Sequence, residues 1–147
     1  MLEISGDDIA ALSDADLRSL IGLLCEADYR LARLPTRDIQ WGGHQNAPDG
    51  GLDVTVRSEV DPPSNSFVPR RVSGFQVKKP DMPRSEILKE MRPDGALREE
   101  IKTLVAEGGA YIIVSANGST SDSALKARLK AMREAVADQE EPDRLPE

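Results

Sequence analysis

Residues 74–79 read Gly-Phe-Gln-Val-Lys-Lys, and this alternation of apolar and polar side chains predicts a β-strand. Successive side chains of a strand point to opposite faces, so we expect Phe75 and Val77 on one face. Gln76 and Lys78 then share the other face. The strand therefore carries an amide and an ammonium group side by side, and it is the part of the chain around which the fold and the chemistry are organised.

Residues 52–57 alternate in the same way and predict a second strand. We expect its buried face to hold Leu52, Val54 and Val56. Asp53 would turn away from that face. A loop with two consecutive prolines joins the two runs, so the strands are predicted to pair antiparallel, with Asp53 beside the amide and ammonium groups.

The spacing of apolar residues predicts a helix before these strands. Asp7 or Ser13 would cap this helix, with Asp16 as the partner of Ser13, and the helix would end before Pro35. A short strand is expected at residues 38–41. The apolar stripe of the helix consists of Leu17, Leu20, Ile21, Leu24 and Leu31.

After the two strands, further helices are expected at residues 85–91, from Leu97 to Gly108, and at residues 123–137. The run at 110–114 is apolar without interruption, which is typical of a strand inside a sheet that helices cover on both faces. The fold class is therefore α/β, with a small mixed β-sheet flanked by helices.

The composition is that of one globular domain, expected over residues 1–140, with a linker-like tail at 141–147. Hydrophobic residues make up 39% of the 147 residues and charged residues 31%, which excludes a disordered chain and a membrane protein. No basic and apolar leader opens the chain, so we expect a cytoplasmic protein. The chain has one cysteine, Cys25, and one histidine, His44, which excludes an intramolecular disulfide and a metal site built from several of either residue.

The net charge of −7 argues at first sight against a partner rich in phosphate groups. The charge is uneven, however. Residues 1–66 carry 12 acids and 5 bases (−7), residues 67–98 carry 4 acids and 8 bases (+4), and residues 99–147 carry 10 acids and 6 bases (−4). The basic block contains the strand with Gln76 and Lys78, so the total charge does not exclude DNA, and weak, salt-sensitive binding is expected.

The polar groups of the two strands suit a divalent cation. Mg²⁺ prefers oxygen ligands, and Asp53, the side-chain oxygen of Gln76 and a backbone carbonyl near Val77 would supply them. The ion would lower the pKa of an attacking water and stabilise charge on a phosphate. Lys78 would orient that water or neutralise the transition state. The alternative is that these residues form only the solvated face of a half-buried sheet.

The segment from Trp41 to Asp53, which ends Asp49-Gly50-Gly51-Leu52-Asp53, and the later Gln76-Val77-Lys78 resemble the PD-(D/E)XK nuclease superfamily. The resemblance is closest to Mrr-like restriction endonuclease domains. It implies a restriction-endonuclease-like core and Mg²⁺ or Mn²⁺ as cofactor. It also implies that Asp53 and Gln76 bind the metal and that Lys78 is the catalytic lysine.

The helix before the sheet often supplies a further glutamate in such domains, and Glu26 is the candidate here. An ion pair with Arg30, four residues further on, is the alternative role for Glu26. Phosphate contacts are expected from Lys79 and Arg84, with Arg70 and Arg71 beside them. A solvated basic face is the alternative interpretation of these four residues.

The resemblance covers about residues 15–137 and extends to the N-terminal effector domains of large bacterial STAND-type NTPases in antiphage defence. It implies a metal-dependent endonuclease that acts on double-stranded DNA, as a homo-oligomer or within a larger STAND NTPase. Two alternatives stay open. One is a catalytically inactive nuclease fold used for nucleic-acid binding or oligomeric assembly, and the other is a domain that binds only proteins.

Overall fold

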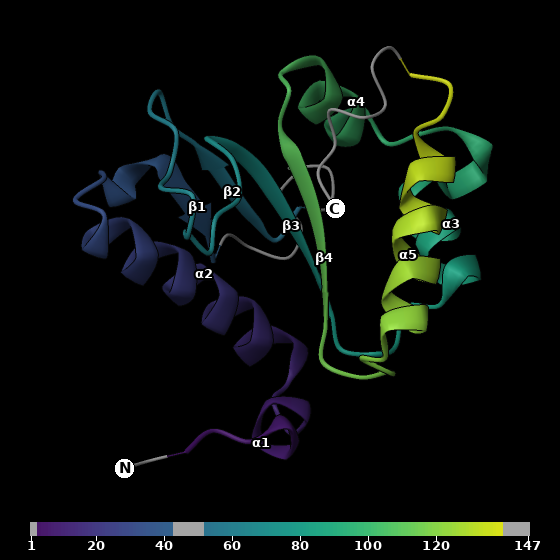
Figure 1. The fold of residues 1–147 in the computed structure, drawn as a ribbon, viewed down its shortest axis with the longest axis horizontal. Coiled ribbons are helices and arrows are strands. Elements are labelled where there is room, and N and C mark those ends of the chain that lie inside the picture. Colours follow the sequence, from purple (N-terminus) through teal and green to yellow (C-terminus); the bar gives the residue numbers. More distant parts are fainter. Residues whose placement is uncertain (1–2, 43–51, 140–147) are drawn as a thin grey trace.

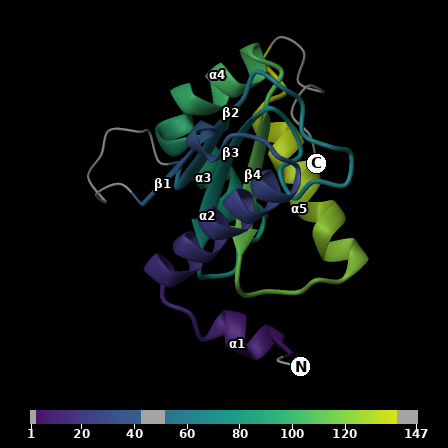
Figure 2. The same cartoon turned by 90° about the vertical axis from the view of Figure 1, so that its left-hand side faces the viewer.

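The computed structural model describes residues 3–42 and 52–139, and it confirms an α/β architecture. A four-stranded mixed sheet separates two helical layers (Figure 1). One face packs against α2, which crosses in front of the strands in Figure 2, and the other packs against α3, α4 and α5. The short helix α1 lies apart from the sheet, before α2. In order, the elements are α1 (Gly6–Ala10), α2 (Asp14–Leu31), β1 (Ile39–Trp41), β2 (Val54–Arg57), β3 (Val72–Lys78), α3 (Arg84–Met91), α4 (Glu99–Ala106), β4 (Ala110–Ser115) and α5 (Asp122–Ala135), with single 3₁₀ turns at Thr36–Asp38 and Pro93–Gly95.

The strands lie in the order β1-β2-β3-β4. The first three pair antiparallel, as predicted for the two central runs, whereas β4 is parallel to β3. The prediction that residues 110–114 form a strand covered by helices on both faces is confirmed, because Ile112 and Val114 pack toward α2 while Tyr111 and Ile113 pack toward the other helices. Within the described residues β4 is an edge strand, so the coverage of its faces, rather than a central place in the sheet, accounts for the apolar run.

The strand β3 extends beyond its antiparallel partner. The β2–β3 pairing runs from Arg57 with Val72 to Val54 with Phe75. Among the described residues, the last part of β3, from Gln76 to Lys78, continues past the start of β2 and pairs with β4 alone. We call this place, at the C-terminal end of β3 and beside Asp53, the notch, because within residues 3–42 and 52–139 no second strand pairs with β3 there.

The alternation predicted for residues 52–57 fails at its first position. Val54 and Val56 are buried against α2, but Leu52 packs in the opposite core. A Cβ added at Gly74 would lie 2.9 Å from Leu52 Cδ1, which places the two residues in contact. The chain bends at Asp53, and the strand begins only at Val54, so the face of Leu52 is not set by strand periodicity.

The helix α2 also differs from its predicted stripe. Its buried side chains are spaced four residues apart, at Leu17, Ile21, Cys25 and Tyr29. Leu24 and Leu31, which were expected in the stripe, are 40% and 86% exposed. A ridge of four-residue spacing is what packs against the sheet here, and it leaves the flanking leucines toward solvent.

The other predicted helix caps and helix ends lie close to those in the structure. Ser13 caps α2 and accepts a hydrogen bond from the backbone of Asp16, as predicted, whereas Ser5 rather than Asp7 caps a separate helix α1. The helices predicted after the strands begin and end within two residues of α3, α4 and α5. In the described ranges, no helix has the length and apolar character of a membrane span. His44, Asp49 and the tail 141–147 lie outside the described residues.

Candidate functional site

Asp53 sits at the notch in the sheet, immediately before β2. Its backbone N–H donates to the carbonyl of Phe75 at 2.8 Å, which extends the β2–β3 ladder by one bond. Its side-chain Oδ2 then accepts the backbone N–H of Val77 at 2.7 Å. The carboxylate thus takes the place of a strand residue opposite β3, which explains an aspartate where strand propensity disfavours one.

Gln76 lies beside Asp53, as the sequence predicted. Its Nε2 is 3.3 Å from Asp53 Oδ2, and the residue is buried in the described structure. The two ends of an amide group are interchangeable by a half-turn, so the same geometry brings the Gln76 oxygen to this carboxylate. Mg²⁺ prefers oxygen ligands, so Asp53 and the side-chain oxygen of Gln76 would be the residues that hold it here.

Lys78 points to the same side of β3 as Gln76 but has a partner of its own. Its Nζ lies 2.9 Å from Oε2 of Glu90, on the last turn of α3. Arg98, at the start of α4, holds the same glutamate through an Nη2–Oε1 contact of 3.1 Å and an Nε–H bond to the Glu90 carbonyl. Glu90 is therefore fixed from two sides and positions the ammonium group.

Glu90 was not among the site residues predicted from the sequence, although one signal pointed to it. Glu90 lies between Ile87 and Met91, the two buried side chains of α3, so it stands near the inward face of that helix. A carboxylate that is largely removed from water needs a positively charged partner, and for this face of α3 the partner would come from the sheet. Only the parallel β3–β4 crossover, which places α3 over β3, identifies that cation as Lys78.

The hydroxyl of Tyr111, on β4, belongs to the same region. The residue is 2% exposed, and its hydroxyl has no hydrogen-bond partner within the described part of the protein. Burial raises the pKa of Tyr111, and the charges of Glu90 and Asp53 raise it further while Arg98 lowers it. The Tyr111 hydroxyl therefore lies within electrostatic range of both the Glu90 and the Asp53 carboxylates.

Arg18, which was not predicted from the sequence either, reaches Asp53 from α2. Its Nε is 3.3 Å from Asp53 Oδ1, while Oδ2 faces β3. The carboxylate is thus held between the helix on one side of the sheet and the central strand. Neither α2 periodicity nor charge pattern predicts this pair, because it depends on the angle at which α2 crosses the sheet.

The structure does not bring Glu26 to the Asp53 cluster. Its Oε1 accepts the indole N–H of Trp41 at 2.9 Å, and its Oε2 pairs with Arg30 at 3.1 Å. The second contact is the alternative role that the sequence had offered. Glu26 also lies eight residues beyond Arg18, about 12 Å further along the helix axis.

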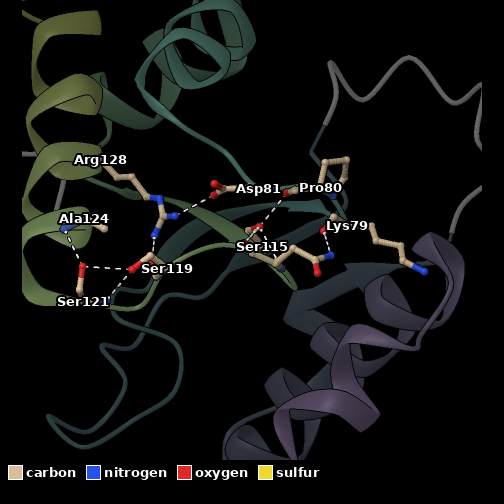
Figure 3. A network of polar contacts seen from close by, with 9 residues as sticks. Lys79, Pro80, Asp81, Ser115, Ser119, Ser121, Ala124 and Arg128 are labelled. Carbon is tan, nitrogen blue, oxygen red and sulfur yellow. Dashed lines mark hydrogen bonds and ion pairs between the residues drawn. The ribbon is translucent and has the colours of Figure 1, made fainter.

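The two residues predicted to contact phosphate are placed differently. Arg84 pairs with Glu134 at 2.6 Å and so joins α3 to α5. The ammonium group of Lys79 has no ion-pair or hydrogen-bond partner among residues 3–42 and 52–139. In Figure 3 its side chain extends away from the neighbouring polar network. Arg70 donates to the carbonyl of Gly108.

That polar network fastens the chain just after Lys78 (Figure 3). The backbone carbonyl of Lys79 accepts a hydrogen bond from Nδ2 of Asn117 at 2.6 Å. The carbonyl of Pro80 accepts one from the Ser115 hydroxyl at 2.7 Å. Asp81 pairs with Arg128 of α5 at 2.7 Å. These contacts connect the segment after β3 to the C-terminal end of β4 and to α5, so the backbone next to Lys78 is fixed by hydrogen bonds and an ion pair.

The donor set at the notch fits a hydrated divalent ion rather than a dehydrated metal cage. In the described ranges, no group of three or more Asp, Glu, His or Cys side chains is arranged to hold a metal. Among the described residues, the notch offers one carboxylate and one amide, and Mg²⁺ commonly binds through one or two carboxylates while it keeps several waters.

Comparisons with protein-family models, with curated proteins and with solved structures find no significant match to this chain. A functional assignment therefore depends on the site and on the sequence motifs.

Proposed function

We propose that this domain is a divalent-metal-dependent endonuclease that hydrolyses phosphodiester bonds in double-stranded DNA. The observation that carries the proposal is the convergence of Asp53, Gln76 and Lys78 at the notch, where the first two are in contact and the third shares the polar face of β3. Their order along the chain resembles that of the Mrr-like restriction endonuclease motif, with Asp53 directly before β2 and with Gln76 and Lys78 within β3.

Asp53 and Gln76 would hold Mg²⁺ or Mn²⁺. When bound, the ion would activate a water and stabilise charge on the scissile phosphate. The backbone N–H of Val77 fixes the orientation of the Asp53 carboxylate, and burial limits the movement of the Gln76 amide. Lys78, held by Glu90, would present its ammonium group to the phosphate or to the attacking water.

The proposal extends to the cellular role and the partner. The sequence resemblance supports an effector domain of an antiphage defence protein, which would act as a homo-oligomer or as part of a larger STAND NTPase. Lys79 is better placed than Arg84 to contact the DNA backbone, because Arg84 is neutralised by Glu134. A role for Glu26 in catalysis has only the resemblance behind it.

A second candidate function is a nuclease fold that binds nucleic acid without cutting it. One feature favours it, since the acid and the base of the motif are both ion-paired within the protein, Asp53 to Arg18 and Lys78 to Glu90. A site used only for structure would keep such pairs permanently.

The test is cleavage of supercoiled plasmid with Mg²⁺ or Mn²⁺ by the wild type, Asp53→Ala and Lys78→Ala. Matched controls are Asp122→Ala and Lys126→Ala, which remove the two members of an exposed ion pair on α5. We expect loss of nicking in the first two variants and wild-type nicking in the controls. Equal nicking by all proteins would indicate contamination and refute the proposal. Metal-independent DNA binding that survives Lys78→Ala, without nicking, would favour the second candidate.

A further inference from the structure

Arg18 approaches Asp53 from the α2 side of the sheet. It lies in the second turn of α2, next to the buried Leu17, so the helix backbone at this point is anchored in the core. Its Nε is 3.3 Å from Asp53 Oδ1, and the two side chains are 30% and 16% exposed. The guanidinium therefore neutralises the carboxylate on which the proposed metal site depends.

The two oxygens of Asp53 have different surroundings. Oδ2 accepts the backbone N–H of Val77 and contacts the Gln76 amide, and both contacts belong to β3. Oδ1 faces the arginine. A divalent cation that binds this carboxylate would meet a positive charge at the distance of an ion pair, where like charges repel strongly. The cation and the guanidinium thus compete for one carboxylate.

The rest of the guanidinium is free to contact something else. Among the described residues, neither Nη1 nor Nη2 of Arg18 has a hydrogen-bond acceptor. The guanidinium fork suits two oxygens of one phosphate group, and it keeps its charge at every physiological pH. A rotation of the side chain about its own bonds would move it from the carboxylate without moving α2.

We propose that Arg18 exchanges partners when the site is loaded: it is the counter-ion of Asp53 in the metal-free protein and binds a phosphate of the DNA in the metal-loaded one. This inference rests on the proposed function, because it takes the cation site and the DNA substrate from it. It adds a substrate-binding residue from α2. The exchange also accounts for a carboxylate whose charge is balanced in the metal-free protein and which becomes available when the cation binds.

Arg30 is a matched control on the same helix. It pairs with Glu26 at 3.1 Å, a contact of the same kind, but it does not touch Asp53. Substitution of either arginine removes one positive charge and one ion pair from α2. Only the substitution of Arg18 should change the affinity for Mn²⁺ and the salt dependence of DNA binding.

The first measurement is Mn²⁺ affinity by calorimetry, without DNA, for the wild type, Arg18→Gln, Arg18→Lys and Arg30→Gln. We expect Arg18→Gln to bind Mn²⁺ about 3- to 10-fold more tightly, since a partly exposed ion pair is lost from the competing state. Arg18→Lys keeps the charge and should stay close to the wild type, as should Arg30→Gln. A merely structural arginine would have the opposite effect, because its loss would loosen Asp53 and weaken metal binding.

The second measurement is the salt dependence of binding to a short DNA duplex, in a Lys78→Met background that prevents cleavage. With Mn²⁺ present, Arg18→Gln should lower the slope of log K against log salt by about 0.9, the value for one lost phosphate contact. Without metal the slope should not change, because Arg18 then stays on Asp53.

Unchanged Mn²⁺ affinity in Arg18→Gln, or no Mn²⁺ binding by any of the four proteins, would overturn the exchange. An identical loss of slope with and without metal would do so as well, since it would show a permanent phosphate contact. If Arg18→Gln binds Mn²⁺ more tightly and the slope falls only with metal, but the wild type never nicks plasmid, the exchange stands and the nuclease activity fails.

Discussion

Replacement of Glu90 by Gln tests whether the carboxylate that pairs with Lys78 is needed both for the stability of the fold and for DNA cleavage. Glu90 is the acceptor for Lys78 at 2.9 Å and for Arg98 at 3.1 Å, and its side chain is only 15% exposed. Glutamine keeps the size of the side chain and removes the charge. Both cations would then lie beside a neutral amide.

The structure sets the expected magnitude. A hydrogen bond to a charged group contributes about 1.5–3 kcal/mol, and Glu90 accepts from two cations. Lys78 and Arg98 are 31% and 30% exposed, so water replaces part of what they lose. We expect the free energy of unfolding to fall by about 2 kcal/mol in total. For a chain of this length that corresponds to about 4–8 °C in Tm.

Urea unfolding followed by circular dichroism measures this change, and Glu107→Gln is the control. Glu107 pairs with Arg57 at 2.7 Å, a shorter contact than either contact of Glu90, but the two side chains are 39% and 54% exposed. The control should lose about 0.5 kcal/mol at most. Equal losses in the two variants would refute the argument that burial, rather than distance, sets the value of these pairs.

Cleavage supplies the second readout. In Glu90→Gln the lysine remains but is no longer held, so the rate at saturating DNA should fall by about 10- to 100-fold while KM stays within about twofold of the wild type. If Glu90 were purely structural, the variant would contain less folded protein, but the folded fraction would cleave saturating DNA at the wild-type rate. Wild-type turnover by the folded variant would show that Glu90 does not position Lys78.

Two further substitutions test the packing of α2. A Cβ added at Gly22 would lie 2.2 Å from Trp41 Cδ2, so Gly22→Ala should lower the free energy of unfolding in a urea titration by about 2–3 kcal/mol. Gly6→Ala is the control. No atom lies within 4 Å of a Cβ added at Gly6, so this variant should be neutral or slightly more stable. Burial raises the pKa of Cys25 from 9.0 to about 12, so between these values the unfolded chain releases a proton that the folded chain keeps, and stability falls as the pH rises. Between pH 9 and 11 the wild type should therefore lose about 2 kcal/mol more than Cys25→Ala, and parallel losses would show that the thiol does not titrate differently in the two states.

The local part of the fold follows from the sequence alone. Strand alternation placed Phe75 and Val77 on one face and Gln76 and Lys78 on the other, because successive side chains of any strand point in opposite directions. Helix positions after the sheet were predicted for a similar local reason, from apolar spacing and from breakers such as Gly108. The pairing of Asp53 with Gln76 needed one more step, the antiparallel pairing of two neighbouring strands.

Contacts between distant segments were not predictable in this way. Leu24 and Leu31 are as apolar as Leu17 and Ile21, and only the direction from which α2 meets the sheet decides which of them are buried. The edge position of β4 is a matter of strand order, which an apolar run does not encode.

For the candidate site, the sequence by itself determined which chemical groups lie on the polar face of β3, since that depends on a period of two. Only the tertiary structure decided which charges balance them. Arg18 and Glu90 come from helices on opposite sides of the sheet, and their ion pairs form because α2 and α3 pack where they do. A buried or half-buried charge requires a nearby partner, but the identity of that partner is a property of the packed molecule and not of the local sequence.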